Sequence, residues 1–334
     1  MAAGYSLTSG EYRQESVSDD ELWAALSSLF SNKTKNTSSY KYGLLKVIID
    51  NLYNVDERLV LSFDQVFSKF SEIYWNLTLK YHLKQSSGTT SKIEQILLTA
   101  KQFYSIPDDV PYESISADIM EEIAKQTKKQ CSRYVIGAFY EDTKQLFYSF
   151  SKREQRIQIN PRMYQFVCKH KILIEKLNYY EWARFLEKIN SDNNSIHILA
   201  KLDESAKRMD LSFYRHILFE EFEYQTCFYC GRKVTPHSSD IDHFIPWSFI
   251  KDDNLWNLVV SCSTCNRKKN DNLATRPFLK KIIIRNRELI PRCNSDKTFY
   301  YSEENLTNVY RWAEINGYSS VWEPNNVNLD FISE

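Results

Sequence analysis

Apolar side chains recur at helical spacing along most of the first two hundred residues. Ser18 is an N-cap residue in front of an acidic turn and the apolar segment LWAALSSLF, a combination typical of a helix start. Segments with the same periodicity continue as far as residue 222. Helices are therefore predicted in six further segments: residues 40–55, 62–83, 92–106, 117–130, 161–190 and 209–222.

The periodicity changes between residues 134 and 160. Short β-branched and aromatic runs, such as YVIGAF and LFYSF, replace the helical spacing there. Such runs are typical of strands, so two or three short strands are predicted near 134–160. Residues 1–220 are thus expected to form a mainly helical region that contains a few strands.

The bulk composition indicates a globular protein. Hydrophobic residues make up 43% of the chain, which is enough for a packed core, and no apolar run approaches the length of a membrane span. The first residues, MAAGYSLTSGEYRQESVSDDE, are polar and acidic, whereas a secretory signal begins with basic and then apolar residues. A cytoplasmic protein with no membrane segment is therefore expected.

Charge is distributed unevenly, although the formal net charge is zero. Residues 267–292 contain nine Lys or Arg and two acidic residues, whereas residues 293–334 contain two basic and seven acidic residues. A solvent-exposed helix face could account for a basic run on its own. Here, however, the basic run begins two residues after the second residue of a cysteine pair, Cys265, which a helix face alone explains less well.

Four of the seven cysteines form two C-x-x-C pairs, Cys227/Cys230 and Cys262/Cys265, separated by 31 residues. In a cytoplasmic chain such pairs indicate a metal site before they indicate disulfides. Four thiolates suit tetrahedral Zn²⁺, and a site with four protein ligands is closed and therefore structural. The alternative is that the four thiols are merely near one another. Gly231 directly follows the first pair and would allow the chain to reverse.

Polar residues of a second kind lie between and after the cysteine pairs. Asp242 and His243 are adjacent, so on a strand they point to opposite faces; one could hold a metal ion while the other acts as a base. Asn266 directly follows Cys265 and offers a neutral oxygen ligand, and oxygen ligands suit Mg²⁺ or Mn²⁺. The basic residues that come next could hold phosphate groups: Arg267, Lys268 and Lys269.

Residues 224–273 resemble the HNH endonuclease motif, the ββα-metal fold, in its zinc-stabilised form. The run DIDHFIPWSFIKDD at 240–253, followed by Asn257 and by NRKK at 266–269, is similar to the HNH domains of RNA-guided CRISPR effector nucleases. The two C-x-x-C pairs are instead typical of free-standing HNH enzymes, and 334 residues offer no obvious room for an RNA channel. The resemblance therefore implies HNH chemistry and no guide RNA.

This resemblance implies a role for each residue of the motif. His243 would be the general base that takes a proton from the attacking water. Asp242 and Asn266 would hold one catalytic Mg²⁺ or Mn²⁺, and Asn257 would fix the loop that orients His243. Arg267, Lys268 and Lys269 would contact the substrate phosphates. The four cysteines would hold the structural Zn²⁺.

The predicted fold class is α+β, in three parts: a mainly helical recognition or partner-binding region at 1–220, an HNH domain on a Cys₄ zinc site at 221–292, and an acidic extension at 293–334. The expected function is metal-dependent hydrolysis of DNA, in restriction or anti-phage defence. Two alternatives stay open: an RNA nuclease or toxin, and a catalytically inactive zinc-containing DNA-binding module. A homodimer or a protein partner could form through the N-terminal helices.

Overall fold

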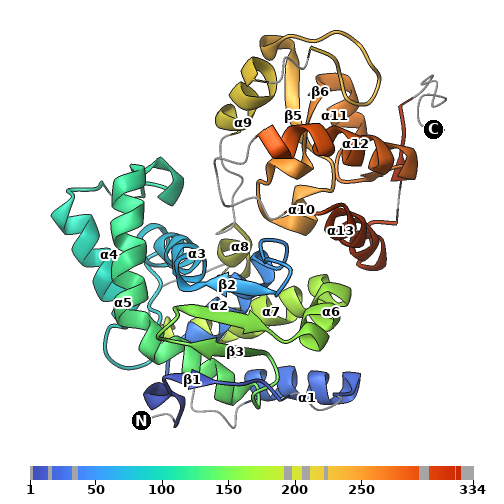
Figure 1. Cartoon of the computed structure of the whole chain (residues 1–334). Coiled ribbons are helices and arrows are strands. Elements are labelled where there is room, and N and C mark those ends of the chain that lie inside the picture. The colour runs from blue at the N-terminus through green and yellow to red at the C-terminus, as the bar shows by residue number, and fades with distance from the viewer. Residues whose placement is uncertain are drawn as a thin grey trace. The chain divides into compact units, whose positions relative to one another are not determined.

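The computed structural model divides the chain into two compact units, Met1–Lys207 and Arg208–Glu334. It describes the following residues: 3–13, 17–31, 37–107, 109–191, 198–204, 211–221, 225–292, 301–319 and 321–324. Helices predominate and strands are short (Figure 1), so the predicted α+β class is confirmed. No helix among the described residues is long and apolar enough to cross a membrane.

The first unit combines helices with one antiparallel sheet. Its first helix, α1 (Asp19–Phe30), begins at Ser18 with a capping box, because Ser18 and Glu21 each bond the other's backbone N–H. The other α-helices in the described part of this unit are α2 (Tyr40–Asp50), α3 (Phe63–Trp75), α4 (Lys92–Phe103), α5 (Ala117–Asp142), α6 (Pro161–Lys169), α7 (Lys171–Ile189) and α8 (Ile198–Glu204).

The sheet of the first unit has the strand order β1-β3-β4-β2. Its strands are β1 (Ser9–Gly10), β2 (Val60–Ser62), β3 (Tyr148–Ser151) and β4 (Arg156–Ile159). The hairpin β3–β4 lies where short strands were expected, but residues 134–142 belong to helix α5 instead. The local preference for strand is overridden there by packing, because α5 contacts the 3₁₀ turn Ala3–Ser6.

Helix α2 forms the centre of the first unit, and every one of its residues is buried. The burial includes Lys46, whose ammonium group forms ion pairs with Asp50 on the same helix and with Glu175 on α7, the latter at 3.4 Å. Burial lowers the pKa of Lys46, but the charges of Asp50 and Glu175 and the neighbouring Tyr179 outweigh it, so the net effect is a rise. Lys46 therefore stays charged and links α2 to α7.

Substitution of Lys46 by methionine is expected to lower the free energy of unfolding by about 3 kcal/mol, because two buried carboxylates then lose their common cation. Urea denaturation of the full chain measures the effect. The matched control is Lys129→Met on the exposed side of α5, for which a change below about 0.5 kcal/mol is expected. Equal effects of the two substitutions would mean that the ion pairs contribute nothing.

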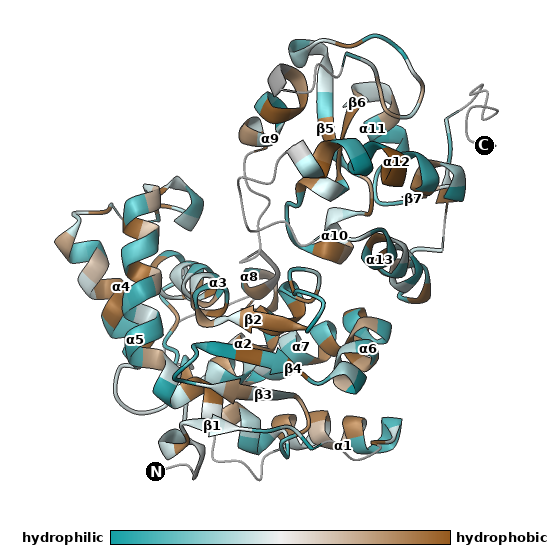
Figure 2. Ribbon diagram, in the orientation of Figure 1, coloured by the Kyte–Doolittle hydropathy of each residue, from teal (hydrophilic) through white to brown (hydrophobic). Residues whose placement is uncertain are grey.

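The second unit is built around the hairpin of β5 (Ser239–His243) and β6 (Leu258–Cys262), which is followed by helix α11 (Ser263–Lys269). Helix α11 contacts both strands. Strand β6 is fully buried, and Figure 2 shows its hydrophobic residues in brown. Among the described residues, the remaining α-helices and strands of this unit are α9 (Ser212–His216), α10 (Trp247–Ile250), β7 (Leu273–Ala274), α12 (Arg276–Arg292), α13 (Glu303–Ile315) and β8 (Val321–Trp322).

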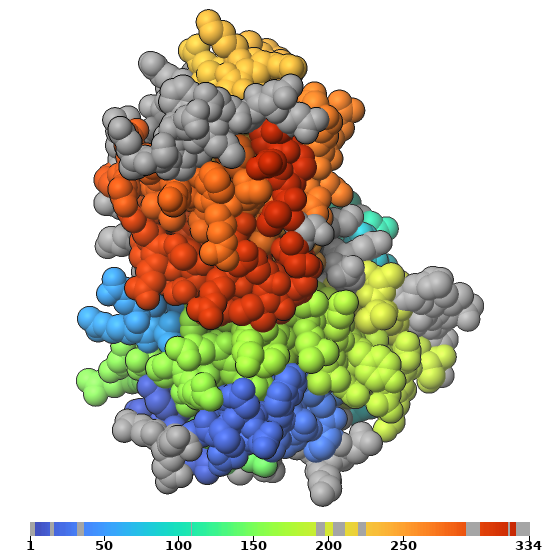
Figure 3. All heavy atoms as spheres, turned by 90° about the vertical axis from the view of Figure 1, so that its right-hand side faces the viewer, coloured from blue at the N-terminus to red at the C-terminus, as the bar shows by residue number. Residues whose placement is uncertain are grey.

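The described part of the acidic C-terminal segment packs against this core. Strand β8 pairs in parallel with β7, and the hydroxyl of Tyr310 on α13 donates a hydrogen bond of 2.6 Å to the carbonyl oxygen of Ala274. In Figure 3 the red atoms of this segment lie against the orange atoms of the preceding helices. Residues 301–319 and 321–324 thus belong to the second unit, while 293–300 and 325–334 lie outside the described residues.

Candidate functional site

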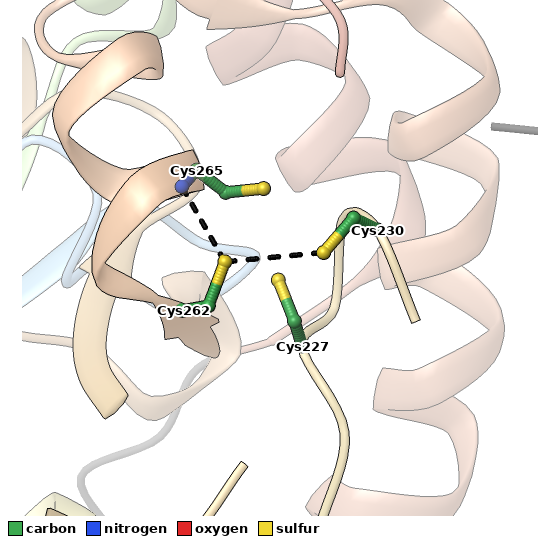
Figure 4. Close-up of side chains that lie close together, drawn as sticks. All are labelled: Cys227, Cys230, Cys262 and Cys265. Atoms are coloured by element: carbon green, nitrogen blue, oxygen red, sulfur yellow. Dashed lines mark hydrogen bonds between the residues drawn. The ribbon is translucent and has the colours of Figure 1, made fainter. Parts of the chain in front are cut away.

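The four cysteines of the two C-x-x-C pairs point toward one another (Figure 4). Their sulfur atoms all lie within 4.8 Å of one another, and the Sγ atoms of Cys230 and Cys262 are 3.9 Å apart. A tetrahedral zinc ion with metal–sulfur distances of about 2.3 Å requires sulfur atoms about 3.8 Å apart. The four side chains therefore fit a structural zinc site.

Local backbone geometry sets up this cluster. Gly231 follows the first pair with a φ of +70°, a left-handed conformation that favours glycine, and its N–H bonds the carbonyl oxygen of Cys227 at 2.9 Å. The second pair begins helix α11, because the sulfur of Cys262 acts as its N-cap and accepts from the N–H of Cys265. The N–H of Phe228 bonds the carbonyl oxygen of Val260 and attaches the first turn to β6.

Electrostatics distinguish the four thiols: burial raises the pKa of Cys230 and of Cys265, and the neighbouring Cys227 raises both further. Burial raises the pKa of the Cys227 thiol, but hydrogen bonds from backbone groups of Cys230, Cys262 and Tyr229 outweigh this and lower the pKa to about 7. The ammonium group of Lys281 also lies nearby, 4.9 Å from the centre of the Phe228 ring. Since four thiolates around Zn²⁺ carry a net negative charge, a lysine at this place complements the site.

The turn that carries the first cysteine pair, Cys227–Cys230, also contacts Asp242 directly. Tyr229 lies between the two cysteines of the first pair, is fully buried, and donates a hydrogen bond of 2.6 Å from its hydroxyl to Oδ2 of Asp242. Burial raises the pKa of Tyr229 well above its usual value, and the charge of Asp242 raises it further. The hydroxyl therefore keeps its proton and acts as the donor.

Lys269 is the second group that holds Asp242. Its ammonium group is fully buried, lies 3.1 Å from Oδ2 of Asp242, and donates a bond of 2.7 Å to the carbonyl oxygen of His243. A phosphate contact by Lys269, as the sequence suggested, does not fit this burial. Arg267 and Lys268, two residues and one residue earlier on α11, are exposed.

Asn266 lies on the same face of α11 as Lys269, and it meets the other carboxylate of β5. Its Nδ2 donates a bond of 3.1 Å to Oδ2 of Asp240, which leaves the amide oxygen on the other side of the group. Tyr229 and Lys269 both engage Oδ2 of Asp242 closely, while Oδ1 is 3.5 Å from Lys269. Oδ1 of Asp242 and the amide oxygen of Asn266 are each an oxygen donor of the kind that Mg²⁺ binds together with water.

Within the described residues, no group of three or more His, Cys, Asp or Glu side chains other than the four cysteines is spaced to hold a metal ion. A magnesium site needs fewer protein ligands, because Mg²⁺ is commonly bound by one or two carboxylates together with water and substrate phosphates. The oxygens of Asp242 and Asn266 are compatible with that minimal arrangement.

His243 is the last residue of β5, and its ring lies on the opposite side of the strand from Asp242. Only 6% of its side chain is exposed, and its Nε2 lies 2.7 Å from Oδ1 of Asp253. The chain after His243 is fixed by Asn257, which is fully buried and forms two hydrogen bonds between its amide and the backbone of Ile245, of 2.8 and 2.9 Å. Asn257 therefore fixes the loop next to the histidine.

The structure brings together more residues than the sequence pattern had assigned. Asp242, His243, Asn257 and Asn266 lie around the β5–β6 hairpin and α11. Three further side chains, to which the sequence pattern gave no role, contact them: Tyr229, Asp240 and Asp253.

Residues 227–275 match the family model for HNH endonucleases. No solved structure gives a significant match to the chain.

Proposed function

We propose that this chain, which carries an HNH endonuclease domain in residues 227–275, is a metal-dependent endonuclease that hydrolyses phosphodiester bonds in DNA. The observation that carries the proposal is the placement of His243 and Asp242 on opposite sides of one strand end, each held by its own buried partners. A base and a metal ligand that act on one phosphate must reach it from different directions.

The histidine supplies the base. His243 takes a proton from water, the water oxygen bonds to phosphorus, and the bond from phosphorus to the 3′ oxygen breaks. The products are a 5′-phosphate and a 3′-hydroxyl, whose proton comes from solvent. Asn257 contributes by fixing the backbone that follows the histidine, which keeps the ring in position for the proton transfer.

The oxygen donors supply a place for the cation. Oδ1 of Asp242 and the amide oxygen of Asn266 would hold Mg²⁺ or Mn²⁺, which when bound stabilises the charge that develops on the phosphate and on the leaving oxygen. Tyr229 and Lys269 hold the far oxygen of Asp242, and Asp240 holds the amide of Asn266. These contacts orient both ligands before the cation arrives.

The nucleic acid would approach the exposed side of α11. Arg267 and Lys268 are exposed there, and positively charged side chains hold phosphates of either strand without reading the bases. The N-terminal unit would then recognise the target or bind a protein partner. Restriction or anti-phage defence is the biological setting that we propose, by analogy with other nucleases of this kind.

The test is digestion of supercoiled plasmid with the purified chain and Mg²⁺, beside EDTA and beside a single-stranded RNA of similar length. A single site with one base cuts one strand at a time, so nicked circles are expected before linear DNA. Cleavage of the RNA alone would indicate the RNA nuclease, and binding of DNA with no cleavage of either substrate would indicate an inactive module. Methylated, unmethylated and phage-modified DNAs, compared side by side, test the role in defence.

Lys269 and Lys268 are adjacent, but their substitution is expected to affect different quantities: kcat for Lys269 and DNA binding for Lys268. Lys269→Met should lower kcat by about 10- to 100-fold with little change in the salt dependence of DNA binding, because the buried ammonium group orients Asp242. Lys268→Met should instead weaken DNA binding and reduce its salt dependence by about one phosphate contact, with kcat nearly unchanged. Steady-state cleavage and binding at several salt concentrations measure both. If Lys269→Met instead weakened DNA binding and reduced its salt dependence while kcat stayed nearly unchanged, Lys269 would be a phosphate contact after all.

A further inference from the structure

His243 and Asp253 form a buried pair at the end of β5. The distance from Nε2 to Oδ1 is 2.7 Å, and only 6% and 7% of the two side chains are exposed. A carboxylate can only accept a hydrogen bond, so Nε2 must carry the hydrogen in this contact. Among the residues that the structure describes, no hydrogen bond to Nδ1 of His243 is found, so this nitrogen is the one left to accept a proton.

The loop that carries Asp253 is held in place independently of the histidine. Lys251 takes a left-handed conformation, with a φ of +62°, at the end of α10. Oδ1 of Asp252 accepts a bond of 2.9 Å from the N–H of Asp253, the next residue. From the other side, the hydroxyl of Tyr214 on α9 donates a bond of 2.6 Å to the carbonyl oxygen of Asp253. The carboxylate is thus aimed at the ring by contacts that do not involve the ring.

Two consequences follow for a histidine that acts as a base. A hydrogen bond to one ring nitrogen determines which tautomer is present and how the ring is turned. When the ring takes up a proton at the other nitrogen, it becomes a cation, and a buried carboxylate at hydrogen-bond distance stabilises that cation without being protonated itself. A neutral backbone carbonyl would fix the tautomer equally well but would stabilise the charge less.

We infer that Asp253 is a positioning residue for the reaction, which holds His243 in the Nε2–H tautomer so that Nδ1 faces the water and accepts its proton. The inference rests on the proposed function of His243 as general base. In the step itself the proton moves from water to Nδ1, the water oxygen bonds to phosphorus, and the Nε2 hydrogen stays on the ring and remains bonded to Asp253. The carboxylate is a carboxylate before and after the step.

Nitrogen NMR of the full chain with labelled histidine tests the tautomer directly. The chain has six histidines, and the signals of His243 are those lost in His243→Gln. Under conditions in which the ring is neutral, the Nε2–H tautomer is expected for His243 in the wild type and a loss of that preference in Asp253→Ala. An Nδ1–H tautomer in the wild type overturns the inference. If Asp253 only stabilised the fold, Asp253→Ala would not change the tautomer of His243 in particular.

Cleavage kinetics provide the second measurement, with Asp271→Ala as the matched control. Both substitutions remove one aspartate carboxylate from the second unit, but Asp271 is exposed and accepts a hydrogen bond from the hydroxyl of Ser248, not from the ring. Asp253→Ala should lower kcat by about 10- to 100-fold with KM within about threefold, whereas Asp271→Ala should change kcat by less than about threefold. Equal kcat and equal tautomer in the two variants overturn the inference.

Failure of the proposed function would be seen separately. It would appear as cleavage that survives His243→Ala, or as a wild-type chain that cleaves neither DNA nor RNA. In either case the tautomer of His243 still decides whether Asp253 fixes the ring, because that measurement needs no substrate.

Discussion

Cleavage by His243→Ala is expected to fall by about two to four orders of magnitude, the usual contribution of a general base. The variant should still fold, because the side chain that it lacks contacts Asp253 rather than the zinc cluster or the β5–β6 ladder. It should also still bind DNA, since Arg267 and Lys268 are unchanged. Single-turnover nicking of plasmid at saturating Mg²⁺ measures the loss, and zinc content together with a binding assay confirms that the rest of the site is intact.

The matched control for this substitution is His216→Ala. His216 lies in the same unit, is exposed, and ends helix α9. Nicking by this variant should stay within about threefold of the wild type, as expected of an exposed substitution away from the site. If His243→Ala were to cut nearly as fast as His216→Ala, His243 would have no part in proton transfer, and the base would have to be sought elsewhere.

Local sequence signals predicted most of the helices of the first unit, and one segment shows why such signals have a limit. The capping box at Ser18 and Glu21 depends on residues three apart and can be recognised from sequence alone. The run 134–139 has the residues of a strand but lies in α5. A Cβ atom on Gly137 would lie 2.0 Å from the carbonyl oxygen of Gly4, so the helix and the N-terminal turn cross at two glycines. The two glycines are more than 130 residues apart in the sequence, so no local pattern can predict this contact.

In the candidate site, spacing predicted which elements meet but not which side chain each residue touches. The two C-x-x-C pairs and the start of α11 follow from motif spacing. Helical periodicity could also have shown that Lys269 shares a buried face with Cys265, four residues earlier. The contact of Asp253 with His243 depends on a loop with a left-handed residue at Lys251, and the sequence does not reveal which of two adjacent aspartates turns toward the ring.

Two residues near the cysteine pairs in the sequence, one for each pair, connect the zinc cluster to Asp242. Tyr229 lies between Cys227 and Cys230 and donates to Asp242, and Lys269 follows Cys265 by one helical turn and holds the same carboxylate. Loss of zinc would therefore release both groups that orient Asp242, the proposed ligand of the catalytic cation. It would also remove the folding free energy that the metal supplies, which is about 10 kcal/mol or more for structural zinc sites.

Cys265→Ser is accordingly expected to lose the zinc ion, to leave the second unit unfolded or prone to proteolysis, and to abolish cleavage. Elemental analysis, limited proteolysis and plasmid nicking measure the three effects on the same preparations. Cys131→Ala is the matched control, because Cys131 is a buried cysteine of the first unit that lies outside the cluster. It should keep one equivalent of zinc and most of its activity.

Asp242→Asn and a brief treatment with EDTA separate the two kinds of metal. Each should stop cleavage while the zinc equivalent and the protease resistance of the second unit remain, because thiolates hold Zn²⁺ in a closed site and oxygen ligands hold an exchangeable Mg²⁺. Added Mg²⁺ should restore the EDTA-treated protein but not Asp242→Asn. Loss of zinc from Asp242→Asn, or a folded and active Cys265→Ser, would contradict the division between a structural thiolate site and a catalytic oxygen site, since the two sets of ligands would then act as one.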